Sequence, residues 1–202
     1  MAYNSDPELC PVPIRSLRPT QLTVGLIEVE GKRNNWRSTK KKGQFLGHHM
    51  IPVVIGPKKE PYVIDHHHLA RALLDEGQDE ILVQAVANLS SLSQENFWRF
   101  LDYRAWVHPF DEKGTRQPFS AIPKKISQLK DDPFRSLAGA VRNAGGFAKE
   151  VQPFMEFIWA DYFRRSFKAS DIRKRWKTTL QEAIVLAHDR EAHFMPGWCG
   201  PH

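Results

Sequence analysis

The sequence predicts an α+β fold in which a first half containing a sheet is followed by an all-helical second half. Up to about residue 92, short apolar runs alternate with turn residues, whereas beyond it apolar residues recur every three or four positions. The 41% hydrophobic and 26% charged residues are typical of a globular protein and argue against wholesale disorder or a coiled coil. We therefore expect two domains, residues 1–92 and 93–202.

The first half is expected to hold three strands and two helices. Proline residues exclude an early helix, so residues 12–21 are expected to be extended. Apolar runs bounded by turn residues predict strands over 50–55, 62–64 and 81–87. Helices are expected over 24–38 and 66–76, the second with Asp65 as its N-cap and Gly77 after its end.

The second half is expected to consist of five helices, joined by polar loops. Their predicted ranges are 93–106, 122–130, 133–143, 153–167 and 170–188, with Asp132 as the N-cap of the third. Polar residues in aromatic settings, among them Trp106, His108 and Arg135, are expected to pack between the halves. Asp161 lies on an otherwise apolar helix face and would need a partner there, such as Arg135.

Composition excludes several classes of protein. No apolar run reaches the roughly 18 residues that a membrane span needs, so we expect no membrane partner. The first 13 residues lack a basic region followed by an apolar core, and two cysteines do not make a disulfide framework or a four-thiolate metal site. We expect a cytoplasmic protein.

An excess of basic residues favours polyanionic partners. There are 29 Lys and Arg against 23 Asp and Glu, a net charge of +6. The excess is concentrated in residues 32–42, which hold no acid, and in residues 157–177, where the cations are interleaved with aromatic residues. A solvated charged face is the alternative interpretation. The candidate nucleic-acid contacts are Lys40, Lys41, Lys42, Arg164, Arg165 and Lys174.

The segment VIDHHHLARAL, residues 63–73, is the densest polar cluster. A helix that begins directly after a buried strand directs free backbone N–H groups and its positive dipole end to one place, which favours an anion such as phosphate. The candidate phosphate or nucleotide ligands are His66, His67, His68, Arg71, Lys32, His48 and His49. Adjacent helical histidines point about 100° apart, so three in a row do not ligate one metal and no metal site is assigned. Packing or capping is the remaining alternative for a single histidine.

The order LRPTQ, a helix, IPVVIG, YVIDHHHLARAL and ILVQAVANLS resembles the ParB/sulfiredoxin superfamily, most closely its ParB-like nuclease branch, over residues 12–90. The resemblance implies a small mixed sheet with helices that holds a nucleotide between the first helix and the strand-to-helix turn. Serine-kinase and sulfiredoxin relatives carry an aspartate, a glycine and histidines ahead of an arginine at this turn. Asp65, His67 and His68 match that pattern, whereas His66 replaces the glycine and Leu69 the arginine.

The resemblance also implies catalytic residues. Kinase relatives carry an essential acid on the first helix, and Glu28 is the matching carboxylate by position, with Glu30 as the second choice. Together with Asp65 and His67, Glu28 is therefore the expected catalytic set. A carboxylate beside phosphate acts as a general base or a metal ligand, so Mg²⁺ or another divalent cation is the expected cofactor. The alternative is a surface pair between Glu28 and Lys32.

Three functions remain open on the sequence. The first is a nuclease or nucleotide phosphohydrolase with nucleotide and DNA as partners. The second is a partition-type DNA-binding protein that is regulated by nucleotide and does not turn it over, although no convincing helix-turn-helix follows the first domain. The third is a kinase of a small metabolite such as an amino acid, in which the helical half would cover the substrate.

Overall fold

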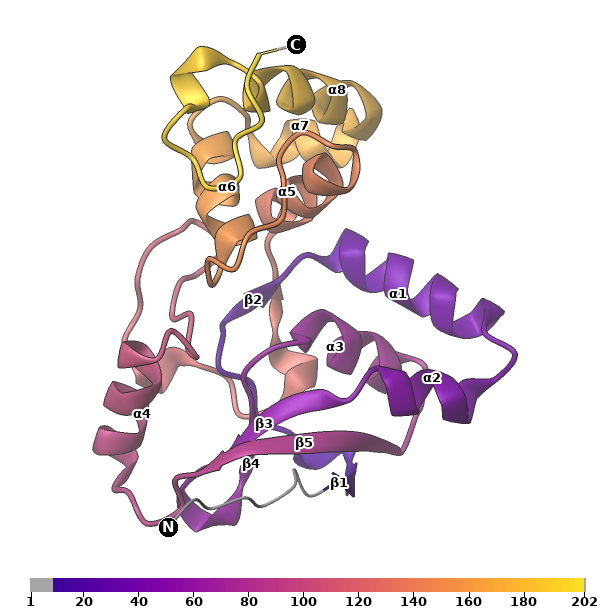
Figure 1. Cartoon of the computed structure of the whole chain (residues 1–202), viewed down its shortest axis with the longest axis vertical. Coiled ribbons are helices and arrows are strands. Elements are labelled where there is room, and N and C mark those ends of the chain that lie inside the picture. The colour runs from indigo at the N-terminus through magenta and orange to yellow at the C-terminus, as the bar shows by residue number, and fades with distance from the viewer. Residues whose placement is uncertain (1–8, 202) are drawn as a thin grey trace.

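The structure of the protein is a computed structural model, which describes residues 9–201. It consists of a sheet lobe and a helical lobe, stacked along the long axis of the molecule (Figure 1). This arrangement confirms the predicted α+β class. Of the N-terminal segment inspected for a secretory signal, residues 1–8 lie outside the described residues. None of the described helices combines the length and the apolar character that crossing a membrane requires.

The sheet lobe is built on a four-stranded mixed sheet with the order β1-β5-β3-β4. Strand β3 (Ile51–Ile55) runs parallel to β5 (Glu80–Asn88) and antiparallel to β4 (Pro61–Val63). Strand β1 (Leu9–Pro13) pairs antiparallel with β5 at the edge, a position where its prolines are tolerated because one side of the strand needs no partner. The three predicted strands are confirmed to within one residue at each end.

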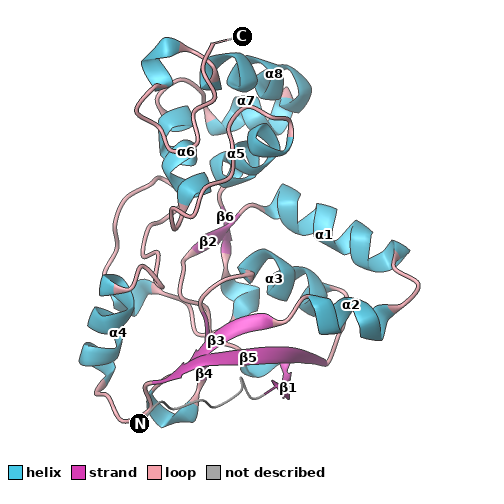
Figure 2. Ribbon diagram, viewed as in Figure 1, coloured by secondary structure: helices cyan, strands magenta, loops and turns pink. Residues whose placement is uncertain are grey.

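Helices α1 (Leu26–Ser38) and α3 (His67–Asp75) pack against each other and on one face of this sheet (Figure 2). Their apolar residues Val29, Trp36, Leu69 and Leu73 join Ile51 and Val53 of β3 in one buried core. Both helices confirm the predicted ranges to within two residues. The short helix α2 (Lys42–His48) has no buried residue, and its apolar pattern did not predict it.

Residues 93–131 pack with the sheet lobe. Phe97 and Leu101 of helix α4 (Gln94–Tyr103) are buried against Tyr62 of β4. The helix expected over 122–130 is wrong, because only a 3₁₀ turn forms there (Ile126–Gln128) and β6 (Lys130–Asp131) then pairs in parallel with β2 (Thr23–Val24). Residues before Asp132 therefore pack in the sheet lobe and residues after it in the helical lobe. The boundary between the lobes lies near Asp132 rather than near the expected residue 92.

The helical lobe consists of α5 (Pro133–Asn143), α6 (Met155–Arg164), α7 (Ala169–Lys174) and α8 (Trp176–Ala187) around a core that includes Trp159, Phe163 and Phe147. Asp132 caps α5 as expected, since its carboxylate accepts the backbone N–H groups of Phe134 and Arg135. The single helix expected over 170–188 is instead divided at Arg175, whose backbone leaves the helical region.

Candidate anion-binding site between the lobes

A pocket of about 740 Å³ opens where the two lobes meet. The start of α1 and the turn before α3 form its sheet-lobe wall, and α5 and residues 149–156 form its helical wall. The sheet-lobe wall carries Glu28, Lys32, His49, Asp65, His66 and His68. The charged residues of the helical wall are Arg135, Arg142, Lys149, Glu150 and Glu156, with Arg104 and Trp106 beside them. Residues predicted to bind phosphate therefore share one pocket with charged residues of the second half.

His66 occupies the turn between β4 and α3 in a left-handed conformation with φ = 64°. Glycine is the residue best suited to positive φ, and it is the residue that the serine-kinase and sulfiredoxin pattern described above has in place of His66. Asp65 is not the helix N-cap that we expected: its carboxylate accepts the N–H of His66, at 2.6 Å, and α3 begins one residue later. His66 Nδ1 lies 3.2 Å from the Met50 carbonyl oxygen and donates to it, which leaves Nε2 as the other polar atom of the ring.

Backbone strain is concentrated at this pocket. The described chain has five non-glycine residues with clearly positive φ, and three of them, His66, Ala105 and Phe154, line the pocket. A non-glycine residue in this conformation is destabilising and persists only where surrounding contacts hold it. Because such residues cluster at functional sites, the pocket is a better candidate site than its charges alone would indicate.

His67 and Arg71, both predicted to bind phosphate, do not line the pocket and have other partners. The buried His67 ring accepts the backbone N–H of Thr20 at Nε2, at 3.1 Å, and burial lowers its pKa to about 3. Arg71 binds the Asp75 carboxylate and the Leu129 carbonyl oxygen. His67 therefore secures the chain before α1, and its geometry does not fit a catalytic role in the pocket.

His68 lines the pocket and also ties α3 to the start of α1. Its Nε2 accepts the N–H of Gly25 at 2.9 Å. Burial, followed by the nearby charge of Arg135, lowers the pKa of His68 to about 3, so the ring is neutral at pH 7 and its proton is on Nδ1. Neutral His68 is a hydrogen-bond donor rather than a cation.

Glu28 is the carboxylate that faces the turn. Its Oε2 accepts from Arg135 Nη1 at 2.9 Å and lies 3.8 Å from His68 Nε2, while Oε1 lies 3.8 Å from Lys32 Nζ. Burial favours the neutral carboxyl, but the charged neighbours outweigh burial and lower the pKa of Glu28 to about 2. Because His68 is neutral at pH 7, Arg135 and Lys32 are the cations beside the Glu28 carboxylate there. The alternative pairing with Lys32 is thus present, but it lies on the pocket wall. Glu30 pairs instead with Arg33 and Arg37, outside the pocket.

The start of α1 is not a free anion site. The N–H groups of Gly25, Leu26 and Ile27 donate to His68, Asp131 and Ser136. A Cβ atom at Gly25 would lie 2.5 Å from Ser136 Oγ, so only glycine permits this approach of α1 to α5. These contacts fix the lobes against each other and place Glu28 beside α5.

Arg164 is the clearest correction among the predicted nucleic-acid contacts. Its guanidinium is largely buried and binds the carboxylates of Asp132 and Asp161. Asp161 therefore pairs with Arg164 rather than with Arg135, which binds Glu28. His108 performs the predicted packing between the lobes, since its ring stacks on Phe157 at 3.9 Å.

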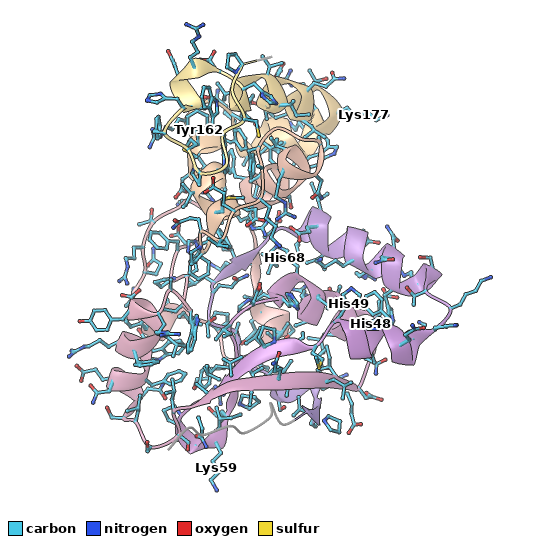
Figure 3. The ribbon with its side chains drawn as sticks, viewed as in Figure 1. His48, His49, Lys59, His68, Tyr162 and Lys177 are labelled. Atoms are coloured by element: carbon cyan, nitrogen blue, oxygen red, sulfur yellow. The ribbon has the colours of Figure 1, made fainter. Side chains whose placement is uncertain are left out.

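The other predicted cations lie outside the pocket. Lys40, Lys41, Lys42, Arg165 and Lys174 are all exposed. His48 and His49 are exposed as well, but only His49 lines the pocket, and its ring stacks on Phe45 at 4.1 Å. Figure 3 shows His68 where α3 approaches the helical lobe, with His49 and His48 further along the sheet lobe toward α2.

Sequence reasoning missed Arg142 as a pocket residue and assigned Arg135 to packing between the halves or to pairing with Asp161. The two arginines are seven residues apart on α5, a spacing that places them on the same helix face, and this spacing was the available signal. Arg142 pairs with Glu156 of α6 across the pocket wall. Within residues 9–201, no group of three or more His, Cys, Asp or Glu side chains is arranged to hold a metal ion.

Comparison with known proteins agrees with the fold and extends the likeness beyond the sheet lobe. A crystal structure of protein Atu1540 from Agrobacterium tumefaciens is 49% identical in sequence, with a TM-score of 0.93 over 98% of this chain and 99% of that chain. No curated protein sequence is significantly similar. A family model described as "Putative ParB-like nuclease" matches residues 10–165, which include both walls of the pocket. The chain therefore belongs to the ParB-like nuclease family.

Proposed function

We propose that the pocket between the lobes binds the phosphate groups of a nucleotide and that the protein hydrolyses a phosphoester bond of that ligand. The observation that carries this proposal is the position of Glu28, an ionised carboxylate held beside the turn at His66 and His68 in a pocket with cations on both walls. A site that only bound phosphate would not need a carboxylate, because like charges repel.

The phosphate ligands in this proposal are hydrogen-bond donors around the turn. His66 and His68 line the turn itself, Lys32 lies one helical turn beyond Glu28, and Lys149 faces them from the helical lobe. Charge-assisted hydrogen bonds to phosphate are among the stronger polar contacts in proteins. The pocket is open and large enough for more than a single phosphate, which favours a nucleotide as the ligand.

Glu28 is a weak proton acceptor in the free protein, because its pKa is about 2. Its expected role is therefore to orient the attacking water or to contribute to holding a divalent cation. Glu28 and Asp65 are the carboxylates near the turn, and Mg²⁺ is commonly held by one or two carboxylates together with substrate phosphates. Such a cation would neutralise phosphate charge, and Glu28 and Asp65 would hold it on the sheet-lobe side.

The experiment that tests this proposal is the comparison of Glu28→Gln with Glu30→Gln. Both carboxylates are on α1, but only Glu28 lines the pocket. With nucleotides and Mg²⁺, Glu28→Gln should lower phosphate release on the order of 10²–10⁴-fold, while nucleotide affinity does not decrease. Glu30→Gln should leave both unchanged. Equal phosphate release by wild type and Glu28→Gln would refute the role of Glu28.

The reaction products separate the alternative functions. Free phosphate supports hydrolysis, a phosphorylated amino acid would support the kinase, and nucleotide binding with no product would support the partition-type binder.

DNA binding is a second candidate function, favoured by the exposed cations Lys40, Lys41 and Lys42 at the junction of α1 and α2. Affinity that depends on phosphate contacts falls steeply as salt rises. Charge reversal of these three lysines should remove binding to DNA at low salt and leave nucleotide affinity unchanged. If DNA binding persists unaltered in that variant, the assignment to these lysines is wrong.

A further inference from the structure

The carboxylate of Glu28 lies where an anionic ligand would be held. Its Oε2 is 2.9 Å from Arg135 Nη1 of the helical lobe and 3.8 Å from His68 Nε2 of the sheet lobe. Arg135 is thus the group that holds this oxygen atom, because His68 Nε2 accepts the Gly25 N–H and has no proton to donate. A phosphate oxygen is attracted to a guanidinium in the same way as a carboxylate oxygen.

Arg135 has an unused hydrogen-bond donor. Its side chain is more than nine-tenths buried, it lines the pocket, and its buried Nε–H has no partner among the described residues. A buried donor without an acceptor is destabilising. Since Glu28 binds only at Nη1, the guanidinium is incompletely satisfied in the free protein.

Gly139 and Phe157 lie beside the ion pair that Arg135 and Glu28 form in the pocket wall. A Cβ atom at Gly139, one turn along α5, would lie 3.0 Å from Glu28 Oε2 and 3.1 Å from Arg135 Nη1. Phe157 of α6 lies on another side, with its ring centre 5.3 Å from the guanidinium carbon. Because residue 139 is glycine, there is space for an acidic group next to Arg135. A larger residue at this position would reduce that space.

We propose that Arg135 binds a phosphate group of the ligand, and that the Glu28 carboxylate occupies the guanidinium until this phosphate displaces it. The proposal rests on the proposed function, because it assumes a phosphate ligand in this pocket. It gives the helical lobe a direct part in recognition. It also makes Glu28 an internal competitor of the ligand in the free protein.

Displacement would change the chemistry of Glu28. In the free protein Arg135 contributes to keeping the Glu28 carboxyl ionised. Once Arg135 is paired with the phosphate of the ligand, the negative charge of that phosphate lies near Glu28. The pKa of Glu28 would then rise, and Glu28 would become a better proton acceptor. Ligand binding would thereby prepare the carboxylate for the attacking water.

The test is calorimetric titration of the full-length protein with inorganic phosphate and pyrophosphate. Glu28→Gln removes the competing charge, so this variant should bind either probe more tightly than wild type. Arg135→Gln alone leaves Glu28 without its guanidinium and risks misfolding, so the informative variant is the double substitution E28Q/R135Q, which removes both charges. It should bind at least about tenfold more weakly than E28Q, because a charge-assisted contact is lost.

Two further variants complete the design. E28Q/R135K keeps a positive charge and should recover part of the lost affinity. Arg99→Gln removes an exposed arginine that pairs with Glu95 away from the pocket, and should bind like wild type. The proposal is overturned if Glu28→Gln binds no more tightly than wild type, or if E28Q/R135Q binds as tightly as E28Q.

The outcomes also separate this proposal from the proposed function. Nucleotide binding and hydrolysis by wild type, with E28Q/R135Q binding as tightly as E28Q, would retain the function and reject the role of Arg135. No binding of phosphate, pyrophosphate or nucleotide by wild type and E28Q would reject both.

Discussion

Neighbouring histidines in one turn have different roles because the chain directs their side chains differently. His66 and His68 line the pocket, whereas His67, between them, accepts the buried N–H of Thr20. The sequence alone shows three consecutive imidazoles at a helix start. Which of them line the pocket depends on the direction in which α3 packs on α1, and the sequence positions of these two helices lie far apart.

His67→Ala is therefore expected to act on stability. It removes the acceptor of the Thr20 N–H, which then lies buried without a partner, at a cost of about 1–3 kcal/mol in the free energy of unfolding. Urea denaturation measures this loss. The phosphate affinity of the folded variant should stay close to that of wild type. Unchanged stability together with lost phosphate affinity would instead show that His67 binds phosphate.

At the level of helices, the contact between α1 and α5 depends on one glycine. Gly25 lies against Ser136, and an added Cβ would be 2.7 Å from the Ser136 backbone nitrogen as well as 2.5 Å from its hydroxyl. Backbone atoms move less readily than side-chain ends. An alanine at position 25 would therefore separate the two helix starts that place Glu28 beside Arg135.

Gly25→Ala should destabilise the protein by about 1–3 kcal/mol, the usual cost of overpacking. Gly31→Ala is the matched control, because Gly31 is also on α1 and a Cβ atom added there would meet no other atom within 4 Å. It should stabilise α1 by up to about 1 kcal/mol, as alanine is the better helix former. Chemical denaturation of both variants measures the difference, and equal stabilities would show that the α1–α5 contact tolerates a methyl group.

The strands and most of the longer helices follow from local patterns, whereas the segment 122–130 and helix α2 do not. Ile122, Ile126 and Leu129 have a helical spacing, yet they are buried along a segment that forms only a 3₁₀ turn and leads into β6, the strand that pairs with β2. Hydrogen bonds from Lys130 and Asp132 to Leu22 and Val24 decide that outcome, and no local propensity contains them. Helix α2 was missed because it buries no residue and so shows no apolar period.

At the scale of the whole molecule, the sequence identified one wall of the site. The histidine cluster and Glu28 are recognisable because the strand-to-helix turn and the first helix carry the resemblance. Arg135 is 107 residues away from Glu28 and becomes its partner only through the packing of the lobes. The spacing of Arg135 and Arg142 indicates a shared face of α5, but the pairing of Arg135 with Glu28 follows only from the three-dimensional structure.

Three neutral histidines should make the fold sensitive to acid. Burial lowers the pKa values of His67, His68 and His108 from 6.5 to about 3. Between these values the unfolded chain binds protons that the folded protein does not, so stability is complete above about pH 6.5 and falls as the pH decreases. Each histidine contributes a loss of about 1.4 kcal/mol per pH unit.

The free energy of unfolding should thus be up to about 4 kcal/mol lower at pH 5.5 than at pH 7.5. Glu28 has a lowered pKa and weakens the fold only below its unfolded value of 4.5, so this range reports on the histidines. Urea midpoints at the two pH values measure the change. Equal midpoints would mean that the three rings are accessible to protons in the folded protein.

The central claim is that a phosphate ligand binds between the lobes and contacts both. Hydrogen exchange measured with and without a nucleoside triphosphate, in the presence of Mg²⁺, tests it most directly. If the ligand contacts both lobes, exchange becomes slower at the turn of residues 64–69 and, in the same experiment, at residues 149–156 across the pocket. Protection confined to the exposed lysines of residues 40–42, or no protection at either wall, would contradict it.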